Sequence, residues 1–566
     1  MGLGDGLTDY GDKGFARFLR TAFASSMGYS EAMLDRPIVG ITWTASDFNN
    51  CHRLAPSLVE AVKRGVLANG ALPMVFPTAS LGESFLTPTS MYFRNLAAME
   101  TEELVRGQPM DAVVLIGGCD KTLPAQLMAA LSVDKPAIAL PVGPMSTGSF
   151  EGEALGACTD CRRYWAQYRA GDVDEDRLTS VRRNLAATAG TCPVMGTAST
   201  MAALIETMGL SLPGAATVPA VHADRLRIAE LTGTVAARLA VDGTPRPTEL
   251  VTERALDNAV RMLLALGGST NAVVHLAAIA GRAGLRLDMQ RFNELSDDTP
   301  VLVNLKPSGS HYMQDLHEAG GIVQVLRQLD GRCDLSAPTV WGGTLRDGID
   351  AAGDWCNDAV IASPERPVDP NGGLVALFGS LAPDGALLKR SAASPELFEK
   401  TSRAVVFDSL ADMAARIDDP DLDVAEDDAL VLQNAGPKAA GMPEAGYLPI
   451  PGKLARRGVT DMLRISDARM SGTAYGTIVL HVAPEAAVGG PLGLVRTGDR
   501  IRISVRDRTL DLLVSPAELA ERENAARDRT PNEFQSRRSG YAQLYQSHVT
   551  QAPEGCDFDV CAVERS

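Results

Sequence analysis

Three cysteines in short loops have the residue type and the position for a metal centre. Cys51, Cys119 and Cys192 each follow a predicted strand or a Gly-rich turn, and each precedes a predicted helix. The unpaired amides of a helix N-terminus favour a thiolate over a thiol. Three protein ligands leave one coordination position of a metal free, and an open position is typical of a catalytic site. The sequence therefore predicts a catalytic centre of three thiolates.

The elements around these cysteines follow a parallel α/β pattern. Apolar runs at 37–42, 112–116 and 137–142 are typical of buried strands. In the stretch 54–66, apolar residues recur every four positions, as on one face of a helix. Cys119 follows its strand after two glycines, and open α/β sheets bind ligands at the carboxyl ends of their strands. The pattern therefore predicts that the sheet itself presents this thiol.

The composition of the sequence changes near residue 370, where a cluster of prolines and glycines is typical of a linker. Beyond it, apolar and polar residues alternate at 501–505 and at 510–514, as in half-buried strands. We therefore expect an α/β fold with two domains. They are an N-terminal parallel-sheet domain with many helices at 1–370 and a smaller β-rich, barrel-like domain at 371–566.

The composition excludes several classes of function. The chain has 566 residues and a formal net charge of -17, and it has no basic run that could bind nucleic acid or an anionic membrane. No segment reaches the roughly 18 apolar residues of a membrane span, and the first residues do not resemble a signal peptide. Nine cysteines are too sparse for a disulfide scaffold. We expect a cytoplasmic enzyme that acts on a small-molecule substrate and assembles as a homodimer or homotetramer.

Several motifs, in one order along the chain, resemble those of the dihydroxy-acid and sugar-acid dehydratase family. The motifs are GCDKTLP at 118–124, GTCPVMGTASTM at 190–201, GGSTNA at 267–272, GMPE at 441–444 and DARMSG at 467–472. Several long motifs in a fixed order are far more specific than any one of them. The resemblance covers about residues 36 to 545 and implies a [2Fe-2S] cluster on three cysteines with a Mg²⁺ ion beside it.

The resemblance assigns roles to individual residues in both expected domains. Cys51, Cys119 and Cys192 would hold the cluster, although the motif around Cys51 departs from the usual pattern of the family. The residues around Mg²⁺ would be Glu83, Asp120, Lys121 and Glu444. Lys121 would be carbamylated, because a plain ammonium would repel the ion whereas a carbamate offers oxygen ligands.

Ser471, in the expected C-terminal domain, would be the catalytic base. A serine hydroxyl ionises far above neutral pH, so this role requires strong local help. The chemistry agrees with these residue types. Removal of water from a 2,3-dihydroxy acid needs a base for the proton on C2, a Lewis acid for the leaving hydroxyl, and a hard cation near the carboxylate.

The substrate is indicated by one motif. The branched-chain type of the family usually has DGRFSG where this sequence has DARMSG at 467–472, and this variant resembles the sugar-acid branch. We therefore expect an aldonic-acid dehydratase, acting on a pentonate such as L-arabinonate or D-xylonate and producing the 2-keto-3-deoxy acid. A dihydroxy-acid dehydratase of branched-chain amino-acid synthesis is the alternative. A non-catalytic iron-sulfur sensor is an alternative of another class, but it would need neither the Mg²⁺ ligands nor a base.

Other cysteines and histidines have simpler interpretations. Cys158 and Cys161 form a C-x-x-C pair without a second pair or a nearby His, so we interpret them as incidental, with a peripheral redox role as the alternative. His52 and His275 are interpreted as helix residues rather than ligands. The remaining cysteines, which have no metal-like context, are Cys333, Cys356, Cys556 and Cys561.

Overall fold

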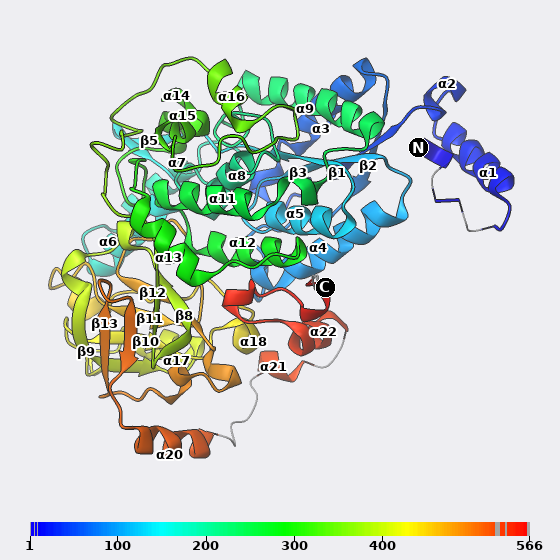
Figure 1. The fold of residues 1–566 in the computed structure, drawn as a ribbon. Coiled ribbons are helices and arrows are strands. Elements are labelled where there is room, and N and C mark those ends of the chain that lie inside the picture. The colour runs from blue at the N-terminus through cyan, green and yellow to red at the C-terminus, as the bar shows by residue number, and fades with distance from the viewer. Residues whose placement is uncertain (1, 5, 8–9, 527–532, 538–539, 563–566) are drawn as a thin grey trace.

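The computed structural model describes residues 2–4, 6–7, 10–526, 533–537 and 540–562. Helices surround a parallel sheet in the N-terminal part, and strands form a closed barrel in the C-terminal part (Figure 1). This arrangement confirms the predicted fold class. The domain boundary at residue 370 stays a prediction, and the first barrel strand begins at Val375.

The parallel sheet has the strand order β2-β1-β3-β4. Its strands are β1 (Ile38–Trp43), β2 (Leu72–Pro77), β3 (Ala112–Gly117) and β4 (Ala137–Pro141). The three apolar runs identified in the sequence are β1, β3 and β4. The sequence reasoning did not identify β2, which contains two prolines. Proline has no N–H to donate to a neighbouring strand, but an edge strand tolerates this because one of its sides has no neighbour.

Helices pack against the sheet and against other helices. The buried helix α5 (Thr122–Val133) contacts β3, and α9 (Ala223–Asp242) contacts β1, β3 and β4. The other helices of this part are α1 (Lys13–Ser26), α2 (Glu31–Leu34), α3 (Ala55–Ala68), α4 (Ser90–Gly107), α6 (Thr159–Ala170), α7 (Glu175–Leu185), α8 (Thr197–Thr207), α10 (Pro247–Leu250), α11 (Glu253–Ala265), α12 (Thr270–Arg282), α13 (Met289–Asp298), α14 (Met313–Glu318), α15 (Gly321–Gln328) and α16 (Leu345–Ala351). A small hairpin of β5 (Gly148–Phe150) and β6 (Glu153–Leu155) precedes α6. In the described part of the chain, no helix is long and apolar enough to cross a membrane.

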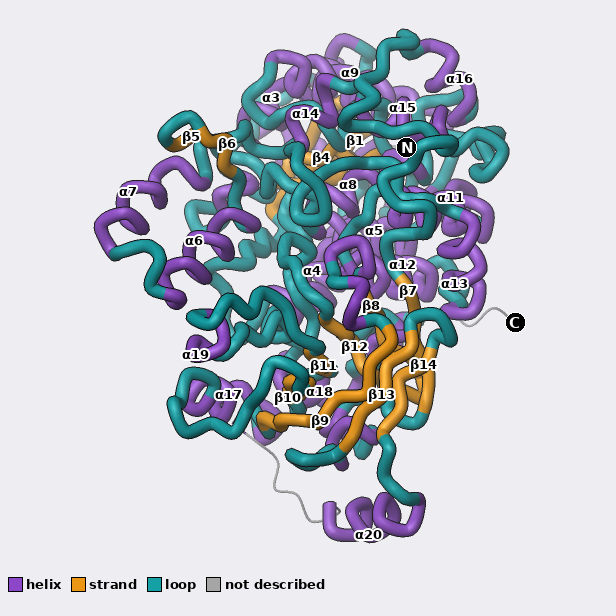
Figure 2. Tube along the Cα trace, turned by 90° about the vertical axis from the view of Figure 1, so that its left-hand side faces the viewer, coloured by secondary structure: helices purple, strands orange, loops and turns teal. Residues whose placement is uncertain are grey.

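The barrel closes in the order β10-β11-β12-β8-β7-β14-β13-β9. Its strands are β7 (Val375–Gly379), β8 (Ala382–Leu388), β9 (Glu399–Phe407), β10 (Ala429–Leu432), β11 (Arg464–Ser466), β12 (Ile478–Ala483), β13 (Arg500–Ser504) and β14 (Thr509–Leu512). The alternating runs expected at 501–505 and 510–514 are β13 and β14. Closure leaves no free sheet edge. Figure 2 shows the barrel strands below the helical part.

The helices of the C-terminal part lie outside the barrel wall. They are α17 (Leu410–Arg416), α18 (Pro437–Ala440), α19 (Gly452–Ala455), α20 (Pro516–Ala526), α21 (Glu533–Ser536) and α22 (Gly540–His548).

Contacts at both ends of the barrel part hold it on the helical part. The side chain of Asn293 on α13 donates to Ala376 O (3.0 Å) and accepts from Ala376 N (2.9 Å), which fixes β7 against the helices. The C-terminal segment returns to the N-terminal helices, where Arg94 of α4 donates to Gly555 O (2.7 Å) and Cys556 O (2.9 Å) (Figure 1). Both chain ends of the barrel part are therefore held on the helical part.

Helix α3, which follows the Cys51 turn, packs against α9 at very short range. A Cβ atom on Gly65 of α3 would lie 1.9 Å from Glu230 O, and one on Gly233 of α9 would lie 2.2 Å from Val62 O. Side chains cannot replace these glycines unless the helices separate. The position of the Cys51 turn thus depends on a glycine contact between two helices.

We expect Gly65→Ala to lower the free energy of unfolding by about 1–3 kcal/mol, the usual cost of overpacking. Gly107→Ala is the control, because no atom lies within 4 Å of the Cβ position at Gly107. Denaturant unfolding of both variants measures the difference. Equal midpoints for the two variants would show that the helices can separate at no cost.

Candidate functional site

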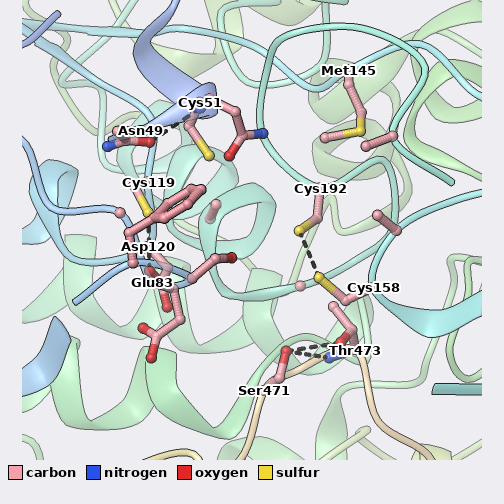
Figure 3. Close-up of a pocket in the computed structure, with 18 of the residues that line it drawn as sticks. Asn49, Cys51, Glu83, Cys119, Asp120, Met145, Cys158, Cys192, Ser471 and Thr473 are labelled. Atoms are coloured by element: carbon pink, nitrogen blue, oxygen red, sulfur yellow. Dashed lines mark hydrogen bonds between the residues drawn. The ribbon is translucent and has the colours of Figure 1, made fainter. Parts of the chain in front are cut away.

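A cavity of about 780 Å³ lies where the carboxyl ends of the parallel strands meet loops of the barrel. Figure 3 shows Cys51, Cys119 and Asp120 on one side and Cys192 on the other, with Ser471 below them. Every residue predicted for the site lines this cavity except Lys121, which is buried behind it. The lining residues whose side chains can bind a metal or take part in chemistry are Cys51, Glu83, Cys119, Asp120, Cys158, Cys161, Arg162, Cys192, Glu444, Ser471 and Thr473.

Successive strands of the sheet present the N-terminal members of the site. Cys51 lies in a short 3-10 turn (Asn50–His52) after β1, Glu83 lies in the loop after β2, and Cys119 lies after β3. Cys192 reaches the same edge because Thr191 pairs with Pro144, just beyond β4. The sheet thus brings together residues more than a hundred positions apart, as predicted for Cys119.

The expected helix start holds only in part for the three thiols. Helix α5 begins at Thr122, close behind Cys119, but α8 begins only at Thr197, well after Cys192. A hydrogen bond with Cys51, together with burial, raises the pKa of Cys119. A hydrogen bond with Cys158 and burial raise the pKa of Cys192 in the same way. Both shifts disfavour a free thiolate, so a bound cation would have to stabilise the thiolate form of these two cysteines. That helix amides favour the thiolates stays a prediction.

Cys158 is close to one of the predicted ligands. Its Sγ atom lies 3.4 Å from Sγ of Cys192, and Cys161 also lines the cavity. The interpretation of this pair as incidental did not foresee the contact, because it joins two segments that have no relation in the sequence.

The buried His52 fixes the loop that carries Cys119. Its Nε2 atom accepts from Gly118 N (2.9 Å) and Cys119 N (3.2 Å). Its Nδ1 atom lies 3.1 Å from Thr44 O, so the neutral ring with a proton on Nδ1 satisfies all these groups. Burial lowers the pKa of His52 to about 4, which keeps the ring neutral. His52 therefore acts on the backbone beside Cys119.

Three carboxylates converge below the thiols. Oxygen atoms of Glu83, Asp120 and Glu444 all lie within 4.8 Å of one another. The ammonium of Lys121, which is fully buried, lies 3.4 Å from Glu83 Oε2 and contacts Asp120 Oδ2 more closely. Oxygen ligands at this spacing fit a hard divalent cation such as Mg²⁺. Carbamylation of Lys121 would replace its positive ammonium by a group with further oxygen ligands.

Arg469 joins the carboxylates of the two parts of the molecule. Its guanidinium donates to Glu83 Oε1 (2.8 Å) and to Glu444 Oε1 (2.6 Å), and its side chain is only 1% exposed. Burial opposes ionisation of Glu83, but the charges of Arg469 and Lys121 prevail and lower its pKa to about 2. At Glu444 burial prevails and raises the pKa. The DARMSG motif contains Arg469, but the motif predicted no role for the arginine.

Ser471 lies in a tight turn after β11. Its Oγ atom lies 2.8 Å from Thr473 Oγ1, and Thr473 O accepts from Thr159 Oγ1 (2.9 Å) at the start of α6. A Cβ atom on Gly472 would lie 2.5 Å from the Ser269 side chain, so glycine is required there. Thr159 and Ser269 thus confine the turn, with Ser471 lining the cavity (Figure 3).

Behind this turn lies a lysine that sequence reasoning missed. Lys389 follows β8 directly, is only 2% exposed, and donates from Nζ to Gly472 O (3.2 Å). The structure pairs it with no carboxylate in the described residues. Burial lowers its pKa from 10.5 to about 7. A single lysine in a strand-like run carries no sequence signal of such a role.

We expect the free energy of unfolding of Lys389→Met, measured relative to the parent, to be higher at pH 7 than at pH 10. Because its folded-state pKa of about 7 is below the ordinary value, the unfolded chain binds this proton more readily between those pH values. The parent therefore loses up to about 4 kcal/mol through this group as the pH falls from 10 to 7. Denaturant unfolding of parent and variant at both pH values measures the effect. A difference between the two proteins that does not change with pH would contradict a buried Lys389.

Comparison with known proteins identifies the family. Residues 36–348 match the N-terminal model, and residues 359–556 match the C-terminal model, of the dihydroxy-acid/6-phosphogluconate dehydratases.

Relatives agree along nearly the whole chain. The chain is 45% identical to the 6-deoxy-6-sulfo-D-gluconate dehydratase of Pseudomonas putida, over 94% of this chain and 91% of that protein. It is 43% identical to the L-arabinonate dehydratase of Rhizobium leguminosarum bv. trifolii, over 94% and 92%. It is 40% identical to the dihydroxy-acid dehydratase of Oleidesulfovibrio alaskensis, over 88% and 91%. The first two names confirm the predicted resemblance to the sugar-acid branch, and the chain belongs to the dihydroxy-acid/6-phosphogluconate dehydratase family of hydro-lyases.

Proposed function

We propose that this protein is a sugar-acid dehydratase that converts an aldonic acid into its 2-keto-3-deoxy acid and water. One observation carries the proposal: a single cavity combines three thiols, three carboxylates and the hydroxyl of Ser471. These groups match the three tasks of the reaction, which are loss of the C3 hydroxyl, stabilisation of charge beside the carboxylate, and removal of the C2 proton.

The donor sets fit two cofactors. Cys51, Cys119 and Cys192 would hold a [2Fe-2S] cluster, and Glu83, Asp120, Glu444 and a carbamylated Lys121 would hold Mg²⁺. When bound, these groups supply Lewis-acid chemistry toward a leaving hydroxyl and a carboxylate. The Arg469 guanidinium orients Glu83 and Glu444 toward the same point.

Ser471 would remove the C2 proton. Its Oγ atom faces the cavity, and Thr473 Oγ1 lies 2.8 Å away, where it can donate to the oxygen once the serine has lost its proton. Lys389 donates a hydrogen bond to the carbonyl of the next residue, Gly472, and in its protonated form it would also favour the ionised serine. As the proton leaves C2, the C3 hydroxyl departs and an enol forms. The enol then tautomerises to the 2-keto acid, so that one water is released for each acid consumed.

The first substrates to test are the pentonates L-arabinonate and D-xylonate. The DARMSG motif supports the sugar-acid branch, and two relatives bear the names of sugar-acid dehydratases. Dihydroxy-acid dehydratase activity is the alternative, because relatives at 40% identity bear that name. Location in the cytoplasm and assembly as a homodimer or homotetramer stay predictions.

We expect the anaerobically prepared protein to form 2-keto acids from aldonates in a panel that also contains 2,3-dihydroxyisovalerate. Ser471→Ala should keep its iron and its fold but lose about 10²- to 10⁴-fold in turnover, the usual contribution of a positioned acid-base group. Exchange of the substrate's C2 hydrogen in deuterated water should fall in parallel.

Two outcomes of this experiment would count against the proposal. Turnover of 2,3-dihydroxyisovalerate alone would favour the branched-chain alternative, and turnover of no acid by a protein loaded with iron would favour a sensor. A Ser471→Ala variant that still exchanges the C2 hydrogen at the parent rate would assign the base to another group.

A further inference from the structure

The first turn of α6 forms one wall of the catalytic cavity. Cys158, Cys161 and Arg162 line the cavity, and Thr159 Oγ1 donates to Thr473 O (2.9 Å), which fixes this turn beside Ser471. Groups on this turn therefore face whatever occupies the space in front of the proposed base.

Arg162 is a cation for which the described residues supply no anionic partner. Its guanidinium lies over the ring of Tyr447, 4.9 Å from the ring centroid, and its Nε atom is buried without a hydrogen-bond acceptor. Within the described residues its side chain forms no ion pair. A half-buried guanidinium has five N–H donors, and buried donors of this kind normally have acceptors.

The other cations in and near the cavity are already paired. Arg53, which also lines the cavity, forms an ion pair with Asp47 (2.9 Å), and Arg163 and Arg169 on α6 itself pair with acidic side chains. Arg469 forms ion pairs with Glu83 and Glu444. Of the cations lining the cavity in the described chain, Arg162 alone forms no ion pair.

A second cavity shows where such an anion would belong. It has a volume of about 390 Å³ and shares Cys158, Cys161 and Arg162 with the first cavity. Trp165 and Tyr447 also line it. Arg162 therefore stands at the junction of the catalytic cavity and a side chamber, while the carboxylate triad lies within the catalytic cavity. The triad and Arg162 thus line one and the same cavity.

We propose that Arg162 forms a subsite for an anionic group on the terminal carbon of the substrate, such as a phosphate, sulfonate or second carboxylate. This inference rests on the proposed function and ranks acids with a terminal anion ahead of the neutral-ended pentonates. A planar guanidinium binds such oxygen groups through paired hydrogen bonds, which a neutral hydroxymethyl end cannot match.

Selectivity of the holoenzyme tests the subsite. The kcat/KM values of 6-phosphogluconate, 6-deoxy-6-sulfogluconate, glucarate, gluconate and L-arabinonate are compared in the parent, Arg162→Gln and Arg162→Lys. We expect Arg162→Gln to lose about 10- to 100-fold on acids with a terminal anion, the worth of a hydrogen bond to a charged group. The loss on gluconate and L-arabinonate should stay below about threefold, and Arg162→Lys should recover part of the lost selectivity. The control Arg64→Gln changes an arginine on the outer face of α3 that pairs with Glu230.

Binding separates failure of the subsite from failure of the proposed function. Calorimetric titration of the Ser471→Ala holoenzyme with 6-phosphogluconate and gluconate measures binding while turnover is slowed, and we expect the affinity difference between them to vanish when Arg162→Gln is added. If the Ser471→Ala protein shows that difference but the parent dehydrates no acid, the proposed function fails and the subsite stands. An equal loss on every acid would mean that Arg162 binds the carboxylate common to all of them, and no loss on any acid would mean that it binds no part of the substrate. Either result would overturn the inference.

Discussion

The candidate site depends on one buried guanidinium. Arg469 comes from the barrel part, yet it donates both to Glu83 after β2 and to Glu444 in the barrel part. Removing one partner from a buried ion pair typically costs about 3–5 kcal/mol, because the remaining charge stays buried and uncompensated. The two parts of the molecule therefore cannot separate at this point without exposing or stranding charge. The same contact lowers the pKa of Glu83 and keeps it ionised.

The rest of the site follows from this junction. The parallel sheet supplies Cys51, Glu83, Cys119 and Asp120 from the carboxyl ends of its strands, and the barrel supplies Glu444 and Ser471 from loops that reach over them. Neither part holds a complete site. A cavity at the contact of two parts of a molecule has room for a substrate that touches both, and ligand sites often lie at such contacts.

The local elements of the fold were predictable because their residues carry the signal themselves. Uninterrupted apolar runs identify β3 and β4, and alternation identifies β13 and β14. Strand β2 was missed because Pro73 and Pro77 count against a strand in the sequence, whereas an edge position tolerates them.

The members of the site were predictable only through the family motifs. Their supporting residues were not, because their roles arise from contacts between distant segments. His52 acts on the loop of Cys119, Lys389 on the turn of Ser471, and Arg469 on a carboxylate 386 positions away. Residue type alone does not distinguish these side chains from ordinary core or surface residues.

The central claim is that both parts of the molecule contribute to one cation site. Its most direct test is Mn²⁺ binding, followed by electron paramagnetic resonance, to the parent, Glu83→Gln and Glu444→Gln. Asp47→Asn, which removes a cavity-lining carboxylate outside the triad, is the control. The account predicts that both glutamate variants lose at least about tenfold in affinity, a loss that even residues supporting a ligand produce, and that the control binds as the parent does. Parent-like binding by Glu444→Gln would contradict it, because the barrel would then contribute nothing to the ion.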